Sequence, residues 1–189
     1  MYSSVYFHRV TRVTEVMLSS AVERSLDSLP DSLDMQRYVD SEVWGALNSA
    51  NDYSRDIVKR FKYRQLMKVC MSLRRQELLD YQVTRLIEMS QNSSIRRSFE
   101  DEIASRAGLL PGYVLIDMPS VKLLLSEPRM AQVDIKIIGD DGKIRWLREH
   151  TPIAEALRSR QVSQSAVYVM TVPSHTEIVS KLIRTYLLD

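Results

Sequence analysis

The hydrophobic residues of this 189-residue chain change their spacing close to Gly108. Before that point they recur at steps of three and four, which is the period of a helix with one buried face. After it they form short runs or alternate with polar residues, as strands do. The change predicts an α+β fold, in which an all-helical part at 1–108 is followed by a small domain at 109–189.

The helical part is predicted to contain consecutive helices joined by short turns. Gly108 follows the last of them, at the C′ position where a left-handed residue ends many helices. The expected helices cover residues 2–26, 34–39, 42–49, 53–61, 64–71, 75–89 and 94–107.

The small domain is predicted to have the element order β-β-β-α-β-α and a mainly antiparallel sheet. A strand at 114–116 precedes a β-hairpin at 131–150, whose Asp-Asp-Gly sequence is typical of a tight turn. The Thr-Pro pair after the hairpin caps a helix, and the sequence SAVYVMTV is a further strand. Ser174 and Glu177 have the spacing of a capping box that opens a last helix at 177–188.

Composition excludes several classes of protein. A single cysteine, Cys70, excludes an internal disulfide and a multi-cysteine metal site. The single cysteine also favours a reducing, cytoplasmic location. No apolar run is long enough to cross a bilayer, so we expect no membrane partner. Only 5 glycines are present, and neither of the glycine-rich phosphate-binding motifs occurs.

Residues with catalytic or metal-binding chemistry do not form a recognisable active site. His8, His150 and His175 lack the spacing of metal ligands, and the last two lie next to predicted helix starts. Cys70 lies in the apolar stretch LMKVCMSL, which is interpreted as a buried helix. We therefore predict no catalytic residue and no metal ligand within these residues.

A basic cluster within 55–75 allows three interpretations. The first is a set of solvated helix faces. The second is a site for nucleotide phosphates, since the planar arginine fork suits them. The third, nucleic acid, is less favoured because aromatic residues do not alternate with the charges. The candidate phosphate-binding or effector-binding residues are Arg55, Lys59, Arg60, Arg64 and Lys68.

The opening stretch MYSSVYFHRVTRVTEVML carries a family pattern. It has the form Met-[Tyr/Phe], then Val-Tyr-x-His-[Arg/Lys], then Met-[Leu/Ile] at its end. The matching residues are Met1, Tyr2, Val5, Tyr6, His8, Arg9, Glu15, Met17 and Leu18. This stretch resembles the helix that follows the metal-binding core of HD-domain phosphohydrolases, and is most similar to the deoxynucleoside triphosphate triphosphohydrolase branch.

Later segments are similar to the same family in the same order. They include SLDMQRYVDSEVWGAL, IVKRFKYRQLMKV, GYVLIDMPS and IKIIGDDGKIRWLREHTPIAEAL. The resemblance therefore extends over essentially the whole chain.

The resemblance implies that the metal-binding His and Asp residues lie upstream of the opening helix. Met1 coincides with an internal methionine of the pattern, so we expect a non-catalytic C-terminal portion of a longer enzyme. A divalent metal (Mg, Mn, Ni or Co) is then expected in the full-length protein. Tyr6 would lie beside the substrate nucleotide, and His8 would serve packing or subunit contacts. The implied partners are the upstream HD catalytic region, a nucleotide (dNTP or GTP) and further copies of the chain.

A second hypothesis belongs to a different class. It is a stand-alone regulatory or scaffold domain that binds nucleotide or RNA through the basic cluster at 55–75 and hydrolyses nothing.

Overall fold

The computed structural model describes residues 9–29, 37–74, 77–118, 136–138, 141–146 and 165–188. Its α-helices are α1 (Arg9–Glu23), α3 (Asp40–Ala50), α4 (Asp52–Lys62), α5 (Asp80–Gln91), α6 (Ser93–Arg106) and α10 (Thr176–Ile183). Short helical turns are η2 (Leu26–Ser28), η6 (Pro173–His175) and the π-helical η7 (Arg184–Leu188). The strands are β1 (Lys68–Arg74), β2 (Val114–Asp117), β3 (Lys136–Ile138), β4 (Ile144–Trp146) and β5 (Ser165–Thr171).

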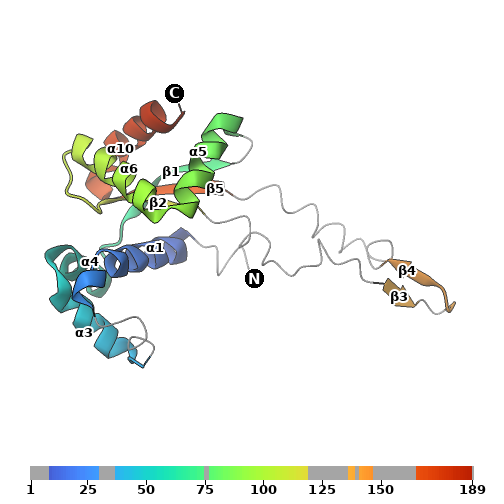
Figure 1. Ribbon diagram of the computed structural model, residues 1–189, viewed down its shortest axis with the longest axis horizontal. Helices are drawn as coiled ribbons and strands as arrows, with labels where there is room; N and C mark the ends of the chain where they lie inside the picture. Colours follow the sequence, from blue (N-terminus) through green and yellow to red (C-terminus); the bar gives the residue numbers. More distant parts are fainter. Residues whose placement is uncertain are drawn as a thin grey trace.

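A three-stranded antiparallel sheet lies between two groups of helices (Figure 1). β5 is its central strand and pairs with β1 on one side and with β2 on the other. β3 and β4 form a second, two-stranded antiparallel sheet, which confirms the predicted hairpin in its described residues. The mixed fold, with helices in the first part and a small antiparallel sheet, is confirmed.

Each face of the three-stranded sheet has its own apolar cluster, because successive side chains of a strand point to opposite faces. Ile116 and Val169 belong to the cluster that includes residues of α5, α6 and α10. Leu115 and Met170, their neighbours in sequence, belong to the cluster that includes residues of α1, α3 and α4. Figure 1 shows these two groups of helices on either side of the sheet.

Asparagine side chains act as N-caps of two of these helices. The Asn51 side chain accepts a hydrogen bond from the Ser54 amide at 2.9 Å and starts α4. Asn92 does the same for α6, through the Ser94 amide at 3.0 Å. Gly108, with φ of 76°, follows α6 as the sequence predicted.

The predicted helix at 64–71 is wrong, because this stretch contains β1. Arg64 has φ of 54°, and the Gln65 amide donates to the Arg60 carbonyl oxygen at 2.8 Å, so α4 ends in a Schellman-type turn. The following apolar run is short enough to suit either a helix or a strand. Pairing with β5 decides for the strand.

Cys70 is therefore a half-buried strand residue and not part of a buried helix. Its thiol donates to the Val169 carbonyl oxygen at 3.4 Å. Burial raises the pKa of the Cys70 thiol to about 11, so the reactive thiolate form is disfavoured at neutral pH.

Two helix starts also differ from the prediction. α5 begins at Asp80 and not at residue 75. The last helix begins at Thr176 after the short turn η6, and no capping box opens it. The Ser174 hydroxyl instead shares a hydrogen bond with Nδ1 of its neighbour His175 at 2.8 Å.

Some predictions lie outside the described residues. These are the first turns of the opening helix, residues 34–36 of the helix at 34–39, and the helix after the Thr-Pro pair. The described residues 37–39 are not helical, and α3 begins only at Asp40, so this part of the predicted helix at 34–39 is wrong. Among the described residues, no helix is long and apolar enough to span a membrane.

The three-stranded sheet joins chain segments from both sides of the expected domain boundary at Gly108. β1 comes from 1–108, whereas β2 and β5 come from 109–189. The boundary itself stays a prediction.

Candidate functional site

α1 and the segment that leads into β1 enclose a cavity of about 380 Å³, called here the cationic pocket. Three of its lining residues carry a positive charge and the other five are apolar. They are Arg9, Val10, Val13, Arg64, Leu66, Met67, Lys68 and Val69. An apolar wall beside several cations suits a ligand that has both an anionic group and an apolar body.

The cations reach this pocket from three separate elements. Arg9 is the first residue of α1, and Lys68 is the first residue of β1. Arg64 lies in the turn between α4 and β1, where its positive φ directs the chain away from the helix axis. Val13 and Met67 also line the pocket, and both are buried in the apolar cluster of α1, α3 and α4.

No carboxylate lines the cationic pocket among the described residues. Arg9, Arg64 and Lys68 likewise have no ion-pair partner in the part of the chain that the structure describes. Most other arginines of the described core are paired, as Arg12 and Arg24 are. The pocket is therefore a local concentration of unpaired positive charge.

The structure brings together two of the five predicted phosphate-binding residues, Arg64 and Lys68. Arg60 lines another cavity, where its Nε donates to Asp56 at 2.6 Å and its guanidinium lies over the Tyr113 ring. Arg55 is held at the start of α4, through Asp52 and the Asn48 carbonyl oxygen.

Lys59 lines none of the cavities described here. Tyr6, the predicted substrate contact, lies outside the described residues. Sequence reasoning did not single out Arg9, which lines the cationic pocket, although Arg9 belongs to the family pattern of the opening stretch.

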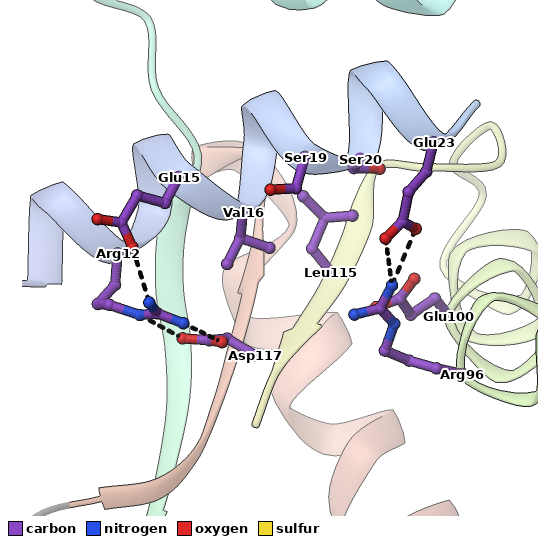
Figure 2. A pocket seen from close by; sticks show the side chains of 10 residues that line it. All are labelled: Arg12, Glu15, Val16, Ser19, Ser20, Glu23, Arg96, Glu100, Leu115 and Asp117. Carbon is purple, nitrogen blue, oxygen red and sulfur yellow. Dashed lines mark hydrogen bonds and ion pairs between the residues drawn. The ribbon is translucent and has the colours of Figure 1, made fainter. Parts of the chain in front are cut away.

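A second cavity, of about 260 Å³, lies on another side of α1 and is called here the charged cavity. Figure 2 shows its lining from α1, β2 and α6. At one end Arg12 donates to both carboxylate oxygens of Asp117, at 2.9 and 2.5 Å, and to Glu15 at 2.7 Å. At the other end Arg96 donates to both oxygens of Glu23, at 2.9 and 3.1 Å.

Glu100 is the buried acid of the charged cavity, with 3% of its surface exposed. It accepts a hydrogen bond from the Ile116 amide at 2.7 Å. Burial raises the pKa of Glu100 to about 7, against the opposing effects of this hydrogen bond and of the positive charges of Arg96 and Arg24. The carboxyl group therefore changes its charge near neutral pH.

The described residues contain no group of three or more His, Cys, Asp or Glu side chains that could hold a metal ion. The divalent metal expected in a full-length enzyme stays a prediction.

The protein-family model of the HD associated region matches residues 1–188. The chain belongs to the HD-associated region family. This membership connects the chain with HD-domain proteins, as the opening stretch indicated. No curated protein matches the chain.

In this HD-associated region, α1 belongs both to the family pattern and to the walls of the two cavities. It contains residues 9–18 of the opening stretch, which resembles the helix after the metal-binding core of HD-domain phosphohydrolases. Residues of α1 also line both cavities.

Proposed function

We propose that this HD-associated region is the non-catalytic C-terminal part of a metal-dependent HD phosphohydrolase that acts on nucleotides. Its role is to bind the phosphates of a nucleotide effector in the cationic pocket and to provide contacts between copies of the enzyme. Tyr6 would complete one wall of the substrate pocket, and the catalytic divalent metal would be held by the upstream region.

The single observation that carries this proposal is the grouping of Arg9, Arg64 and Lys68 around an apolar wall without a carboxylate in the described lining. Unpaired cations in a concave site attract polyphosphates, and each charge-assisted hydrogen bond contributes about 1.5–3 kcal/mol when partly desolvated. The apolar residues between the cations offer a surface for a base or a sugar.

The test is a binding titration of the purified protein with dGTP, GMP and a short RNA. We expect saturable binding of dGTP at millimolar concentration or below, with a clear preference over GMP. Arg64→Ala and Lys68→Ala should each weaken dGTP binding by about tenfold or more, since each removes one charged contact.

Arg55→Ala is the matched control, because Arg55 is tied to Asp52 and the Asn48 carbonyl outside the cationic pocket. It should leave dGTP binding unchanged. Equal losses in all three variants would show that only the net charge of the protein matters. RNA binding that weakens steeply with salt and exceeds dGTP binding would favour the regulatory or scaffold hypothesis instead.

A further inference from the structure

α1 is the shared wall of the two cavities. Arg9 and Val13 face the cationic pocket, whereas Arg12, Glu15 and Glu23 face the charged cavity. A single helix of this length moves largely as a rigid body. Any change in how α1 is held at the charged cavity therefore reaches Arg9 and the cationic pocket.

Two ion pairs join the end of α1 to α6. Arg24, which directly follows α1, donates to both oxygens of Asp101. The other pair belongs to Arg96, which lies between two carboxylates. Its terminal nitrogen contacts both oxygens of Glu23 on α1. Its Nε lies 3.8 Å from Glu100 on α6, which is beyond hydrogen-bond distance. This Nε is buried and has no hydrogen-bond partner in the structure. A buried donor without an acceptor costs free energy of folding. The Nε of Arg96 is such a donor, on the side that faces Glu100.

The charge of Glu100 decides whether Arg96 interacts mainly with Glu23 or with Glu100. While Glu100 is neutral, Glu23 is the stronger partner of Arg96, and α1 is held to α6. When Glu100 loses its proton, its carboxylate attracts Arg96, and it also repels the carboxylate of Glu23. Both effects weaken the Glu23–Arg96 bond. The cavity has room for Arg96 to turn and for water to enter.

Charged and titratable groups surround Glu100 on several elements. α1 contributes Glu23, the turn after it contributes Arg24, α6 contributes Arg96 and Asp101, β2 contributes Asp117, and α4 contributes Tyr53. On α5 and η7, Arg85 lies over Phe99 and Tyr186 contacts Arg106. α10 packs against α6 through apolar residues.

We propose that the protonation of Glu100 controls how α1 is seated on α6, and through α1 the anion affinity of the cationic pocket. In the protonated state α1 is held as the structure shows and the anion binds more tightly. In the ionised state the Glu23–Arg96 contact weakens while the Arg24–Asp101 contact remains, α1 changes its position on α6, and anion binding weakens. The second half of this inference rests on the function proposed for the cationic pocket, and the first half does not.

The first experiment needs no ligand. Nuclear magnetic resonance of the carboxyl carbon of Glu100 and of the α1 amides is followed from pH 5 to pH 9. We expect Glu100 to titrate near neutrality, with the α1 amides shifting at the same midpoint. In Glu100→Gln this amide transition should be absent. Glu102→Gln, an exposed carboxylate on the same helix, should keep it. Titration of Glu100 without a response in α1, or titration at an ordinary carboxyl pH, would overturn the proposal.

The second experiment measures dGTP affinity at pH 6 and pH 8 in the original protein, Glu100→Gln and Glu23→Gln. Between pH 6 and pH 8 the phosphates of dGTP also change their protonation. This change affects all three proteins equally, so the ratio of their affinities at each pH does not depend on it. We expect affinity to fall by about fivefold more in the original protein than in Glu100→Gln, which is a typical coupling between two sites.

Glu23→Gln separates control through α1 from a simple charge effect. If the α1 contact transmits the signal, this variant binds weakly at both pH values and loses the extra pH dependence. If the dependence persists in Glu23→Gln, the charge of Glu100 acts directly and the proposal is wrong. If no variant binds dGTP while α1 still follows Glu100, the function proposed for the pocket fails and the control of α1 stands.

Discussion

Arg64 occupies a backbone position that glycine adopts at lower cost. Its φ of 54° lies in the left-handed region, and Arg64 is the one non-glycine residue with positive φ among those the structure describes. Arg64→Gly should therefore raise the free energy of unfolding by about 0.5–1 kcal/mol. The same variant should lose anion binding, because the guanidinium is removed from the cationic pocket.

Arg64→Ala is the natural comparison for this variant, since alanine keeps the strained conformation but lacks the charge. It should lose binding to the same extent without the gain in stability. Urea denaturation and dGTP titration of the two variants measure both effects. A gain in stability for both, or for neither, would count against backbone strain at Arg64.

Glu100 should make stability depend on pH in a direction opposite to that of most carboxylates. Its pKa is raised from 4.5 to about 7 in the folded state, so its protonated form favours folding. The contribution is fully present below pH 4.5 and is lost as pH rises through 7. The loss amounts to about 3 kcal/mol when the whole shift is counted.

Glu100→Gln should remove this loss, because glutamine can still accept the Ile116 hydrogen bond without becoming charged. At pH 8 the variant should be more stable than the original protein, and at pH 4 nearly equal to it. Chemical denaturation across this range measures the difference. A variant that is less stable at pH 8 would contradict a buried, titrating Glu100.

At the scale of elements, one side chain joins the end of α1 to the start of α4. The Asn51 side chain accepts from the Ser54 amide, and its Nδ2 donates to the Arg24 carbonyl oxygen at 3.0 Å. Asn51→Ala should cost about 2 kcal/mol, since it removes a helix cap and a contact between helices.

Asn51→Asp separates these two contributions. Aspartate keeps the cap acceptor but cannot donate to the Arg24 carbonyl, so it should cost about half as much as alanine. Urea midpoints of both variants, at equal slope, give the comparison. Equal costs would mean that only the contact with α1 matters.

Local patterns predicted most helices of the first part and the strands of the second, because those segments carry a clear period and suitable end residues. β1 was missed because its apolar run is short, and because its partner β5 lies far along the chain. Arg64 and Lys68 were predicted to lie in one helix at 64–71. They lie together instead because α4 ends at Lys62 and the chain turns.

The charged cavity could not be predicted from sequence. Glu100 is the first of three consecutive acidic residues of α6, and Asp101 and Glu102 look equivalent to it in the sequence. Only the packing of β2 and α1 against α6 buries Glu100 and leaves its neighbours more exposed. Tertiary burial, which leaves no local pattern, decides which acid has a raised pKa.

At the scale of the whole molecule, the sheet should make its two apolar clusters unfold together. Met170 and Val169 are adjacent in β5 but belong to different clusters. Met170→Ala should lower the free energy of unfolding by about 2–5 kcal/mol, as large-to-small core changes do. Because β5 belongs to both faces, unfolding should remain a single transition.

This expectation is checked by hydrogen exchange of amides in α4 and α6 at increasing denaturant. Both helices should lose protection at the same concentration, in the original protein and in Met170→Ala. Two separate transitions would instead support independent domains divided near Gly108.

The central position of β5 also bears on how the chain is made. β1 and β2 leave the ribosome long before β5, and in the sheet neither of them pairs with the other. Until β5 arrives, both strands have free edges and exposed apolar side chains, which is the situation that chaperones relieve. The sheet is closed by pairings such as Lys68 with Thr171, which are distant in sequence and therefore slow to form. A ribosome stalled before β5 should hold a nascent chain that proteases cut readily at β1, and synthesis through Thr171 should protect it.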